Sequence, residues 1–359
     1  MAGKKKTGKK KTKSKKSIKY TILYTILAIL LVGLSIGIDQ VYRMFYKNIC
    51  TKSGEPTYLY VHTRMSLDEL MAYMKTDYTI QSPYNFRLHA KLLDFTYVMP
   101  GRYRVDAVEA DLNFIRRLRN GEQAPVKVTF NNIRTKQQLA GRLSQQLLVD
   151  SVSIVSLLND AKFLETYGMK PETAVCLFIP NTYEMYWSVS ARGLVDKFYG
   201  EYKRFWNQER LDKAEKAGLT PVEVAILASI VEEETNKASE RPIVAGLYIN
   251  RLRKGMLLQA DPTVKFAVGD FGIRRVLNKH LQIDSPYNTY KYKGLPPGPI
   301  RIPTAAAMDA VLNYTKHKYI YMCAKETFNG EHNFATTLAE HNRNAARYQK
   351  ALNQRRIMR

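Results

Sequence analysis

The sharpest change of polarity in the chain falls within its first forty residues. Residues 20–38, YTILYTILAILLVGLSIGI, contain no charged side chain. As a helix rising about 1.5 Å per residue they extend about 28 Å, close to the hydrocarbon core of a bilayer at about 30 Å. The run therefore predicts one transmembrane helix. A cleaved signal peptide is the alternative, since Ser35-Ile36-Gly37 has a small-x-small pattern, but the apolar run is long for one.

The residues before this run predict its orientation. Residues 1–19 contain ten lysines and no acidic residue. Basic segments beside a span remain on the cytoplasmic side, where anionic lipids hold them. The sequence predicts a cytoplasmic tail at 1–19 and a single-pass protein of the inner (cytoplasmic) membrane, with nearly all of its mass in the extracytoplasmic (periplasmic) space. The formal charge of the 359 residues is +24. The ten lysines of the tail account for +10, which leaves +14 for the other 340 residues.

After a linker predicted over 39–56, residues 57–131 alternate apolar strands with short helices. A capping box at Ser66-x-x-Glu69 predicts the start of one helix, and Asn120-Gly121 predicts the end of another. The predicted strands and second helix are Tyr58–Thr63, Arg102–Val105, Val126–Phe130 and Ala110–Leu118. The pattern is that of a small α/β module. Residues 132–359 form the next predicted domain, opened by a capping box at Thr135-x-x-Gln138.

The segment 220–236, TPVEVAILASIVEEETN, is the most informative in the chain. Thr220 is a good N-cap residue, and Pro221 and Glu223 suit the first turn of a helix. The helix is apolar until it reaches three consecutive glutamates. Among them, Glu234 follows Leu227, Ile230 and Val231 on the most apolar stripe, at helical spacing.

A carboxyl group on an apolar face loses solvation, and its pKa rises. That is the property of a general acid that works near neutral pH. Glu232 lies instead above the small residues Ala225, Ala228 and Ser229. The alternative is a solvated acidic helix end, paired with Lys237 or Arg241.

Two later segments are rich in polar and aromatic residues. A polar turn at 258–263, LQADPT, precedes the segment 285–290, SPYNTY. The loop 294–300, GLPPGPI, cannot be regular structure because its prolines lack N–H donors. A rigid loop flanked by aromatic residues suits the wall of a groove for a sugar polymer, although a plain connector has the same composition.

The sequence predicts no metal site and no cofactor. His332 and His341 are nine residues apart with no third ligand nearby, and Cys50, Cys176 and Cys323 have no paired spacing.

Six strings together resemble the endolytic murein transglycosylase family (MltG/YceG-like). They are ASIVEEET, SER, INRLRKGMLLQADPTV, SPYNTY, GLPPGPIRIP and HNFATTLAEHN, in this order over about residues 220–345. Upstream, residues 178–183 resemble the family's F-x-P-D-T-Y segment, with Asn181 where aspartate is usual, and Gly101-Arg102-Tyr103 resembles the turn of its LysM-like module.

The resemblance implies an α+β protein with a transmembrane helix, a LysM-like module at 57–131 and a mixed α/β catalytic domain at 132–359. It implies a lyase that cleaves peptidoglycan between N-acetylmuramic acid and N-acetylglucosamine without water, leaving 1,6-anhydro ends and terminating nascent strands. The family's catalytic glutamate corresponds to Glu234, with Glu232 as the second choice. One carboxyl serves as acid and then base, so no second carboxylate is obligatory, unlike in ordinary glycosidases.

The resemblance also suggests which residues hold the sugar. These candidates are Gln259, Thr263, Tyr287, Asn288, Thr289, Tyr290, Pro297, Gly298, His332, Phe334 and Asn342. Asp261 is a further candidate, and as a base that activates water it would make the enzyme an inverting hydrolase.

Two other classes of protein remain as alternatives. One is a catalytically silent peptidoglycan-binding anchor of the wall-synthesis machinery. The other is a binder of nucleic acid or anionic lipid, which needs aromatic residues interleaved with basic ones on one face. The basic residues of the body are scattered, so no nucleic-acid partner is predicted. The family suggests penicillin-binding proteins or other wall synthases as partners.

Overall fold

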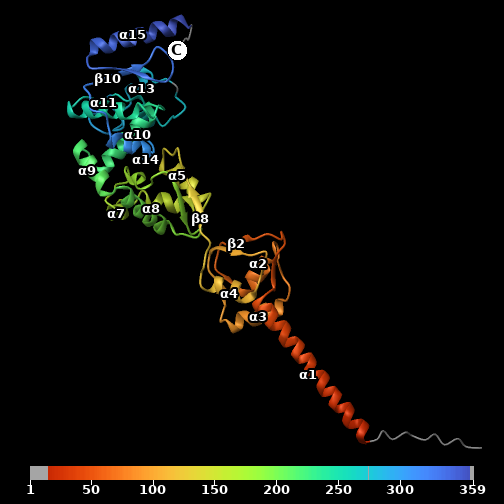
Figure 1. Ribbon diagram of the computed structural model, residues 1–359. Coiled ribbons are helices and arrows are strands. Elements are labelled where there is room, and N and C mark those ends of the chain that lie inside the picture. Colours follow the sequence, from red (N-terminus) through yellow and green to blue (C-terminus); the bar gives the residue numbers. More distant parts are fainter. Residues whose placement is uncertain (1–14, 274, 356–359) are drawn as a thin grey trace, which may run out of the picture. The chain divides into compact units, whose positions relative to one another are not determined.

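The computed structural model describes residues 15–273 and 275–355, and it divides into unit 1, up to Pro125, and unit 2, from Val126 (Figure 1). The mixed helix-and-strand class is as predicted. Residues 1–14, most of the predicted basic tail, lie outside the described residues. The division falls before the strand predicted at 126–130, whereas the predicted module ended at residue 131.

Unit 1 begins with the long helix α1 (Lys15–Phe45). Its segment Ile18–Phe45 has a mean hydropathy of 2.4 and is long and apolar enough to cross a membrane, with no part of the apolar window buried against the rest of the chain. The helix extends beyond the predicted span of 20–38 into the predicted linker. Strand β1 (Ile49–Thr51) then pairs with two other strands, so the region predicted as a linker at 39–56 contains the end of α1 and a strand of unit 1.

The rest of unit 1 packs short strands against three helices. The remaining elements are β2 (Thr57–Val61), β3 (Met65–Ser66), α2 (Leu67–Met74), β4 (Tyr78–Ile80), α3 (Pro83–Leu92), β5 (Tyr97–Val98), β6 (Gly101–Val105), β7 (Val108–Glu109) and α4 (Asp111–Arg119). All pairings are antiparallel, in the order β4-β1-β7 and in the pairs β2-β6 and β3-β5. The predicted capping box of Ser66 and Glu69 is present. Phe86, Tyr103 and Phe114 are fully buried in the core.

Unit 2 has an N-terminal part and a C-terminal part (Figure 1). The N-terminal part contains β8 (Val126–Thr129), α5 (Lys136–Ser144), α6 (Ser151–Leu157), α7 (Ala161–Glu165), the 3₁₀ turn η1 (Ala174–Leu177), β9 (Thr182–Met185), α8 (Ala191–Phe205) and α9 (Gln208–Ala217). The C-terminal part contains α10 (Pro221–Glu234), α11 (Arg241–Arg253), α12 (Asp261–Val268), α13 (Asn278–Leu281), α14 (Ala305–Leu312), β10 (Tyr321–Ala324), β11 (His332–Ala335) and α15 (Leu338–Gln354).

Helix α10 is the centre of the C-terminal part. It begins with the predicted capping box of Thr220 and Glu223 and with Pro221 in its first turn. Every residue from Val224 to Glu232 is buried, because α9, α11, α12 and α14 all pack against this helix. An α-helix that is apolar on all sides must be enclosed. The helix is thereby fixed in position up to its acidic end.

The segment after α14 lies along α11 at very short range. Thr315 donates its N–H to the Pro242 carbonyl at 2.9 Å, and Asn250 donates to the carbonyls of His317 and Tyr319 at 2.8 and 3.1 Å. The approach is close because Gly246 on α11 has no side chain. A Cβ atom there would lie 2.3 Å from the Thr315 carbonyl oxygen.

Replacing Gly246 with alanine is expected to destabilise the protein. Because the obstructing atom belongs to the backbone, α11 or the segment at Thr315 must move, and we expect a loss of about 1–3 kcal/mol of unfolding free energy. Thermal unfolding of the detergent-solubilised chain, followed by circular dichroism, measures it. Gly200→Ala on α8 is the matched control, since nothing lies within 4 Å of a Cβ there, and it should gain up to about 1 kcal/mol. Equal stability of the two variants would contradict the proposed contact.

Candidate active site

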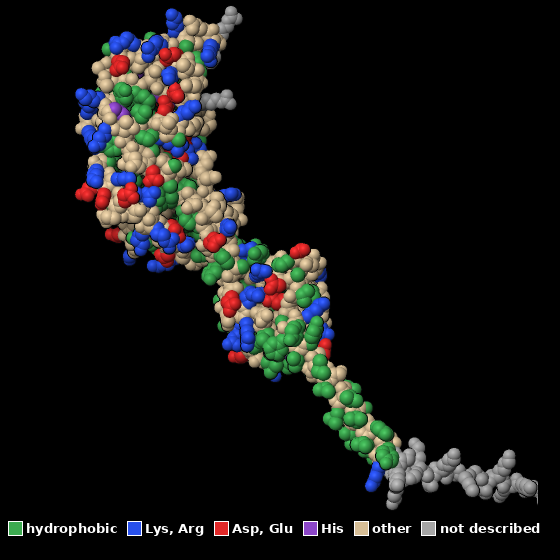
Figure 2. Space-filling view, in the orientation of Figure 1, with side chains coloured by type: hydrophobic (Ala, Val, Ile, Leu, Met, Phe, Trp, Pro, Cys, Tyr) green, Lys and Arg blue, Asp and Glu red, His purple; other side chains and the backbone are tan. Residues whose placement is uncertain are grey.

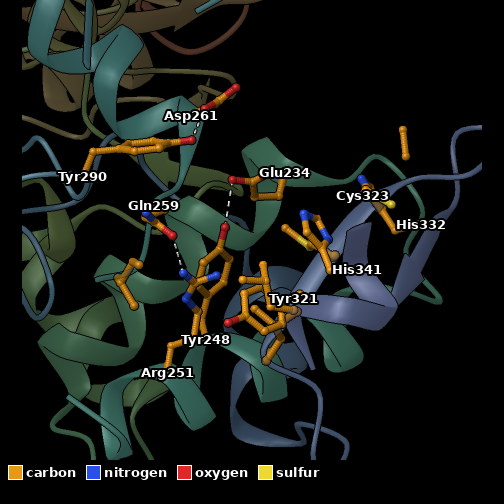
Figure 3. Close-up of a pocket in the computed structure, with 15 residues that line it drawn as sticks. Glu234, Tyr248, Arg251, Gln259, Asp261, Tyr290, Tyr321, Cys323, His332 and His341 are labelled. Carbon is orange, nitrogen blue, oxygen red and sulfur yellow. Dashed lines mark hydrogen bonds between the residues drawn. The ribbon is translucent and has the colours of Figure 1, made fainter. Parts of the chain in front are cut away.

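A cavity of about 440 Å³ opens where α10 ends (Figure 3). Helices α10, α11 and α12, the turn before α12 and the hairpin β10–β11 contribute to its lining. Its lining residues include Glu234, Tyr248, Arg251, Gln259, Asp261, Tyr290, Tyr321, Cys323, His332, Leu338 and His341. Of the residues that the sequence suggested, the structure brings Glu234, Gln259, Asp261, Tyr290 and His332 together here.

Glu234 is the last residue of α10, and its side chain is only partly exposed. Its Oε1 atom accepts a hydrogen bond of 2.9 Å from the hydroxyl of Tyr248, which is buried on α11 (Figure 3). Burial raises the pKa of Glu234 to about 7, with a smaller rise from the charge of Asp261, while the Tyr248 hydrogen bond opposes the shift. A carboxyl group with this pKa can both release and accept a proton near neutral pH.

The two preceding glutamates face other parts of the protein. Glu232 is buried and accepts hydrogen bonds from the N–H and the hydroxyl of Thr304, which caps α14, at 3.0 and 2.8 Å. Glu233 forms ion pairs with Arg134 at 2.8 Å and Arg301 at 2.9 Å. Neither residue lines the cavity, so the geometry gives Glu232 no access to a substrate bound there.

The Gln259 side chain is held in a fixed orientation. Its backbone is left-handed, with φ of +53°, and its Oε1 atom accepts a hydrogen bond of 2.5 Å from Arg251. The other donors of the Arg251 guanidinium bind the carbonyls of Leu257 and Ile320 at 2.9 and 3.1 Å. Since the amide oxygen of Gln259 is occupied, its NH₂ group remains to donate to a ligand.

Asp261 begins α12, and the Tyr290 hydroxyl donates to its Oδ1 atom at 2.6 Å (Figure 3). The sequence predicted a polar turn over residues 258–263, and the structure starts helix α12 within it, at Asp261. Burial, and then the hydrogen bond to Asp261, raise the pKa of Tyr290. The hydroxyl therefore stays protonated and keeps the carboxylate of Asp261 in place.

The other wall of the cavity is the hairpin β10–β11. His332 is tied to the buried Glu240, whose carboxylate accepts from the His332 N–H at 2.8 Å and lies 2.9 Å from its Nδ1. The same carboxylate accepts from the hydroxyl of Thr235, the residue after Glu234, at 3.2 Å. Tyr321 stacks on His341, with ring centroids 5.4 Å apart.

Three of the predicted sugar-binding residues are buried beneath the cavity. Thr263 and Thr289 have their hydroxyls 2.8 Å apart, and Thr289 also accepts from the N–H of Ala260 at 3.0 Å. Asn288 donates to the carbonyls of Leu281 and Ile283 at 2.9 and 2.8 Å. These side chains are at most 1% exposed, so they do not reach a ligand. The hydrogen bond of Thr289 with Ala260 holds the turn that carries Gln259.

The other predicted residues also lie outside the cavity lining. Tyr287 packs on Phe266 with ring centroids 4.7 Å apart, and Phe334 stacks on Tyr319 at 5.7 Å. Gly298 is buried against the Glu172 carbonyl oxygen, where a Cβ would lie 2.1 Å away. Pro297 and Asn342 are exposed. The loop that contains these two residues therefore packs against Glu172 through Gly298 and leaves Pro297 at the surface.

Sequence reasoning missed Tyr248, Arg251, Tyr321 and His341. Tyr248 and Arg251 are three residues apart on α11, a spacing that puts both side chains on one face of a helix. That spacing was one signal for Tyr248 and Arg251, and Arg251 and His341 also lie within the strings that carry the family resemblance. Among the described residues, no group of three or more His, Cys, Asp and Glu side chains could hold a metal ion.

A carboxyl group with a neutral pKa, set among oriented polar groups in an open cavity, defines a general acid–base site. The chain belongs to the YceG-like family, whose model matches residues 59–347.

Several known proteins are similar to this chain. It is 45% identical over 129 residues to an endolytic murein transglycosylase of Bacillus subtilis, covering 36% of this chain and 35% of that protein. It is 26% identical over 295 residues to one from Streptococcus pneumoniae, covering 73% and 53%. The chain thus spans about half or less of these curated relatives. A crystal structure of a yceG-like protein from Listeria monocytogenes matches 80% of this chain and 98% of its own, with 26% identity and a TM-score of 0.52.

Two substitutions are expected to move the pKa of Glu234 in opposite directions. Tyr248→Phe removes a hydrogen bond that stabilises the carboxylate, so the pKa should rise above about 7. Asp261→Asn removes a neighbouring negative charge, so the pKa should fall. Infrared difference titration of the carboxyl band, with Glu234→Gln to assign it, measures both. A shift of the same sign in the two variants would contradict this account of the site.

The raised pKa of Glu234 also makes stability depend on pH. The unfolded chain releases the Glu234 proton near pH 4.5 and the folded chain near 7, so this group lowers stability as pH rises through that window. Above pH 7, Glu234→Gln should exceed the parent in unfolding free energy by about 3 kcal/mol, and near pH 4 the two should be alike. Urea unfolding at both pH values tests this. A difference independent of pH would mean that it does not come from titration.

Proposed function

We propose that the protein is a membrane-anchored endolytic transglycosylase of peptidoglycan. It cleaves the bond between N-acetylmuramic acid and N-acetylglucosamine without water and leaves 1,6-anhydro ends. The observation that carries the proposal is Glu234, a carboxyl with a pKa of about 7 at the base of the cavity. Membership of the YceG-like family and the names of the relatives support it.

In the first step Glu234 acts as the acid. Because burial keeps a large fraction of this carboxyl protonated near neutral pH, it donates a proton to the oxygen between the two sugars. The bond from C1 of the muramyl residue to that oxygen breaks, and the leaving sugar departs with a new hydroxyl. The positive charge that develops at C1 lies beside the carboxylate just formed.

In the second step the same group acts as the base. Glu234 takes the proton of the muramyl 6-hydroxyl as that oxygen bonds to C1 and closes the anhydro ring. The proton lost in the first step is thereby restored, and no water enters the product. Tyr248 donates to Oε1 and stabilises the carboxylate between the steps, which leaves Oε2 for the substrate.

Three further groups are suited to hold the glycan. The free NH₂ of Gln259 is a donor for the carbonyl of an N-acetyl group, and its partner Arg251 fixes its direction. His332, oriented through Nδ1 by Glu240, has Nε2 left for a sugar hydroxyl. Asp261, held by Tyr290, is an acceptor for hydroxyl groups in the same cavity.

The proposed topology places both units outside the cytoplasm. The helix α1 anchors the chain, and the lysines of residues 1–19 retain the N-terminus inside. The glycan strands then reach the cavity from the outer face of the cytoplasmic membrane, where nascent strands are made. Termination of these strands beside a wall synthase, such as a penicillin-binding protein, is the cellular role that we propose.

Product analysis tests the reaction. The full chain in detergent is incubated with purified peptidoglycan, and the fragments are identified by mass spectrometry. The parent should yield 1,6-anhydro-muramyl ends, and Glu234→Gln should lose at least about 100-fold of the rate, as expected for a general acid–base group. Glu233→Gln is the matched control, since the neighbouring carboxyl pairs with Arg134 and Arg301 and should leave most of the activity.

Other products would assign other functions. Fragments heavier by one water, with reducing ends, would mean hydrolysis, and Asp261→Asn would then abolish activity by removing the base that activates water. Glycan binding by the parent without any product, unchanged in Glu234→Gln, would mean a silent peptidoglycan anchor. Either result overturns the proposed transglycosylase.

A further inference from the structure

The helix α1 reaches the edge of a bilayer core at Asp39. Residues 20–38 carry no charge and span about 28 Å as a helix, so Asp39 is the first residue that must meet the headgroups. The helix does not end there but continues to Phe45. Val41, Tyr42 and Phe45, in this continuation, are each at least 50% exposed.

Unit 1 is attached to α1 at that same level. Gln40 donates to the Asn85 side chain at 2.6 Å, and Asn85 donates to Asp39 at 3.5 Å. One turn further on, Arg43 donates to Gln81 at 3.3 Å. From Asp39 to Arg43 the helix rises only about 6 Å, within the headgroup layer of about 5–8 Å on each side of a bilayer. The N-terminal turn of α3 is therefore held at headgroup depth.

The outer face of α3 has the composition of a membrane interface. Tyr84, Leu88 and Leu92 follow one another at spacings of four, which puts them on one stripe of the helix. Tyr84 is 72% exposed and Leu92 is 66% exposed. Arg87 and Lys91 are also exposed and flank this stripe. Arg87 forms an ion pair with Asp68 at 2.6 Å, and this pair is itself exposed. Figure 2 shows hydrophobic side chains gathered at the end of unit 1 where α1 enters.

We infer that this face of α3 is a second membrane contact, which lies in the headgroup layer of the leaflet from which α1 emerges. The ring of Tyr84 and the side chain of Leu92 enter the boundary between headgroups and acyl chains. Arg87 and Lys91 reach the lipid phosphates, as basic side chains beside an interfacial apolar stripe do. The contact continues the surface that α1 already presents to lipid, and it holds unit 1 against the bilayer.

Lipid quenching of tryptophan tests the contact in the full chain. The protein is reconstituted into vesicles whose lipids carry bromine either near the interface or deep in the acyl chains, and Tyr84→Trp is compared with Tyr58→Trp. Tyr58 is 41% exposed on β2, and Figure 1 shows this strand at the end of unit 1 away from α1. Trp187 and Trp206 are buried, so the emission of the parent is subtracted. We expect loss of emission for the tryptophan at position 84 and none for that at 58.

A tryptophan at Leu31, in the middle of α1, separates the inference from the anchoring on which it rests. Quenching at both 31 and 84 supports the contact. Quenching at 31 but not at 84 overturns the contact and leaves the anchor intact. No quenching at 31 overturns both. If position 84 is shielded from bromine and also from aqueous acrylamide, a protein covers the face, and the inference of a lipid contact is wrong.

A surface substitution measures the energetics. Leu92→Ser in the Tyr84→Trp chain removes apolar area from the face without touching the core, since Leu92 is mostly exposed. The ratio of chains in which α3 contacts lipid to chains in which it does not should fall about tenfold, as the loss of one buried leucine predicts. Tyr58→Ser in the same chain is the control and should leave quenching unchanged. Equal quenching in all three chains would contradict the insertion of Leu92.

Discussion

The complete enclosure of helix α10 is the constraint from which the rest of unit 2 follows. A helix buried on all sides must end somewhere, and this one ends in three carboxyl groups that cannot all reach water. Each carboxyl therefore needs its own hydrogen-bond or ion-pair partner to offset the loss of hydration. Glu232 caps the next packed helix through Thr304, and Glu233 is neutralised by two arginines. Glu234 has a tyrosine hydroxyl and no ion pair within the described part of the chain, and of the three glutamates it alone lines the cavity.

The chemistry proposed for the site depends on the different partners of these three carboxyl groups. An ion pair would lower the pKa of Glu234 and fix its charge, whereas a hydrogen bond from Tyr248 compensates only part of the cost of burial. The pKa of Glu234 therefore lies near neutral pH, where both the protonated and the ionised forms are populated. This suits a group that must release a proton and recover it within one reaction.

Local signals in the sequence predicted local structure well. The caps at Ser66, Thr135 and Thr220 form as the sequence predicts, because each depends on residues within one turn. The apolar stripe leading to Glu234 was local too. The contact with Tyr248 joins two helices, and nothing near Glu234 indicates it. Polar motif residues such as Asn288 were ambiguous, since a buried amide that binds carbonyls and a ligand-binding amide look alike in a sequence.

The carboxylate of Glu240 has a mechanical consequence. One end of its hydrogen-bond set is Thr235, on the turn that carries Glu234, and the other is His332, on the facing hairpin. Hydrogen bonds through Glu240 therefore link the two walls of the cavity, which are the end of α10 and the hairpin β10–β11. Because this link joins the two walls directly, it opposes any change in the distance between Glu234 and the facing hairpin.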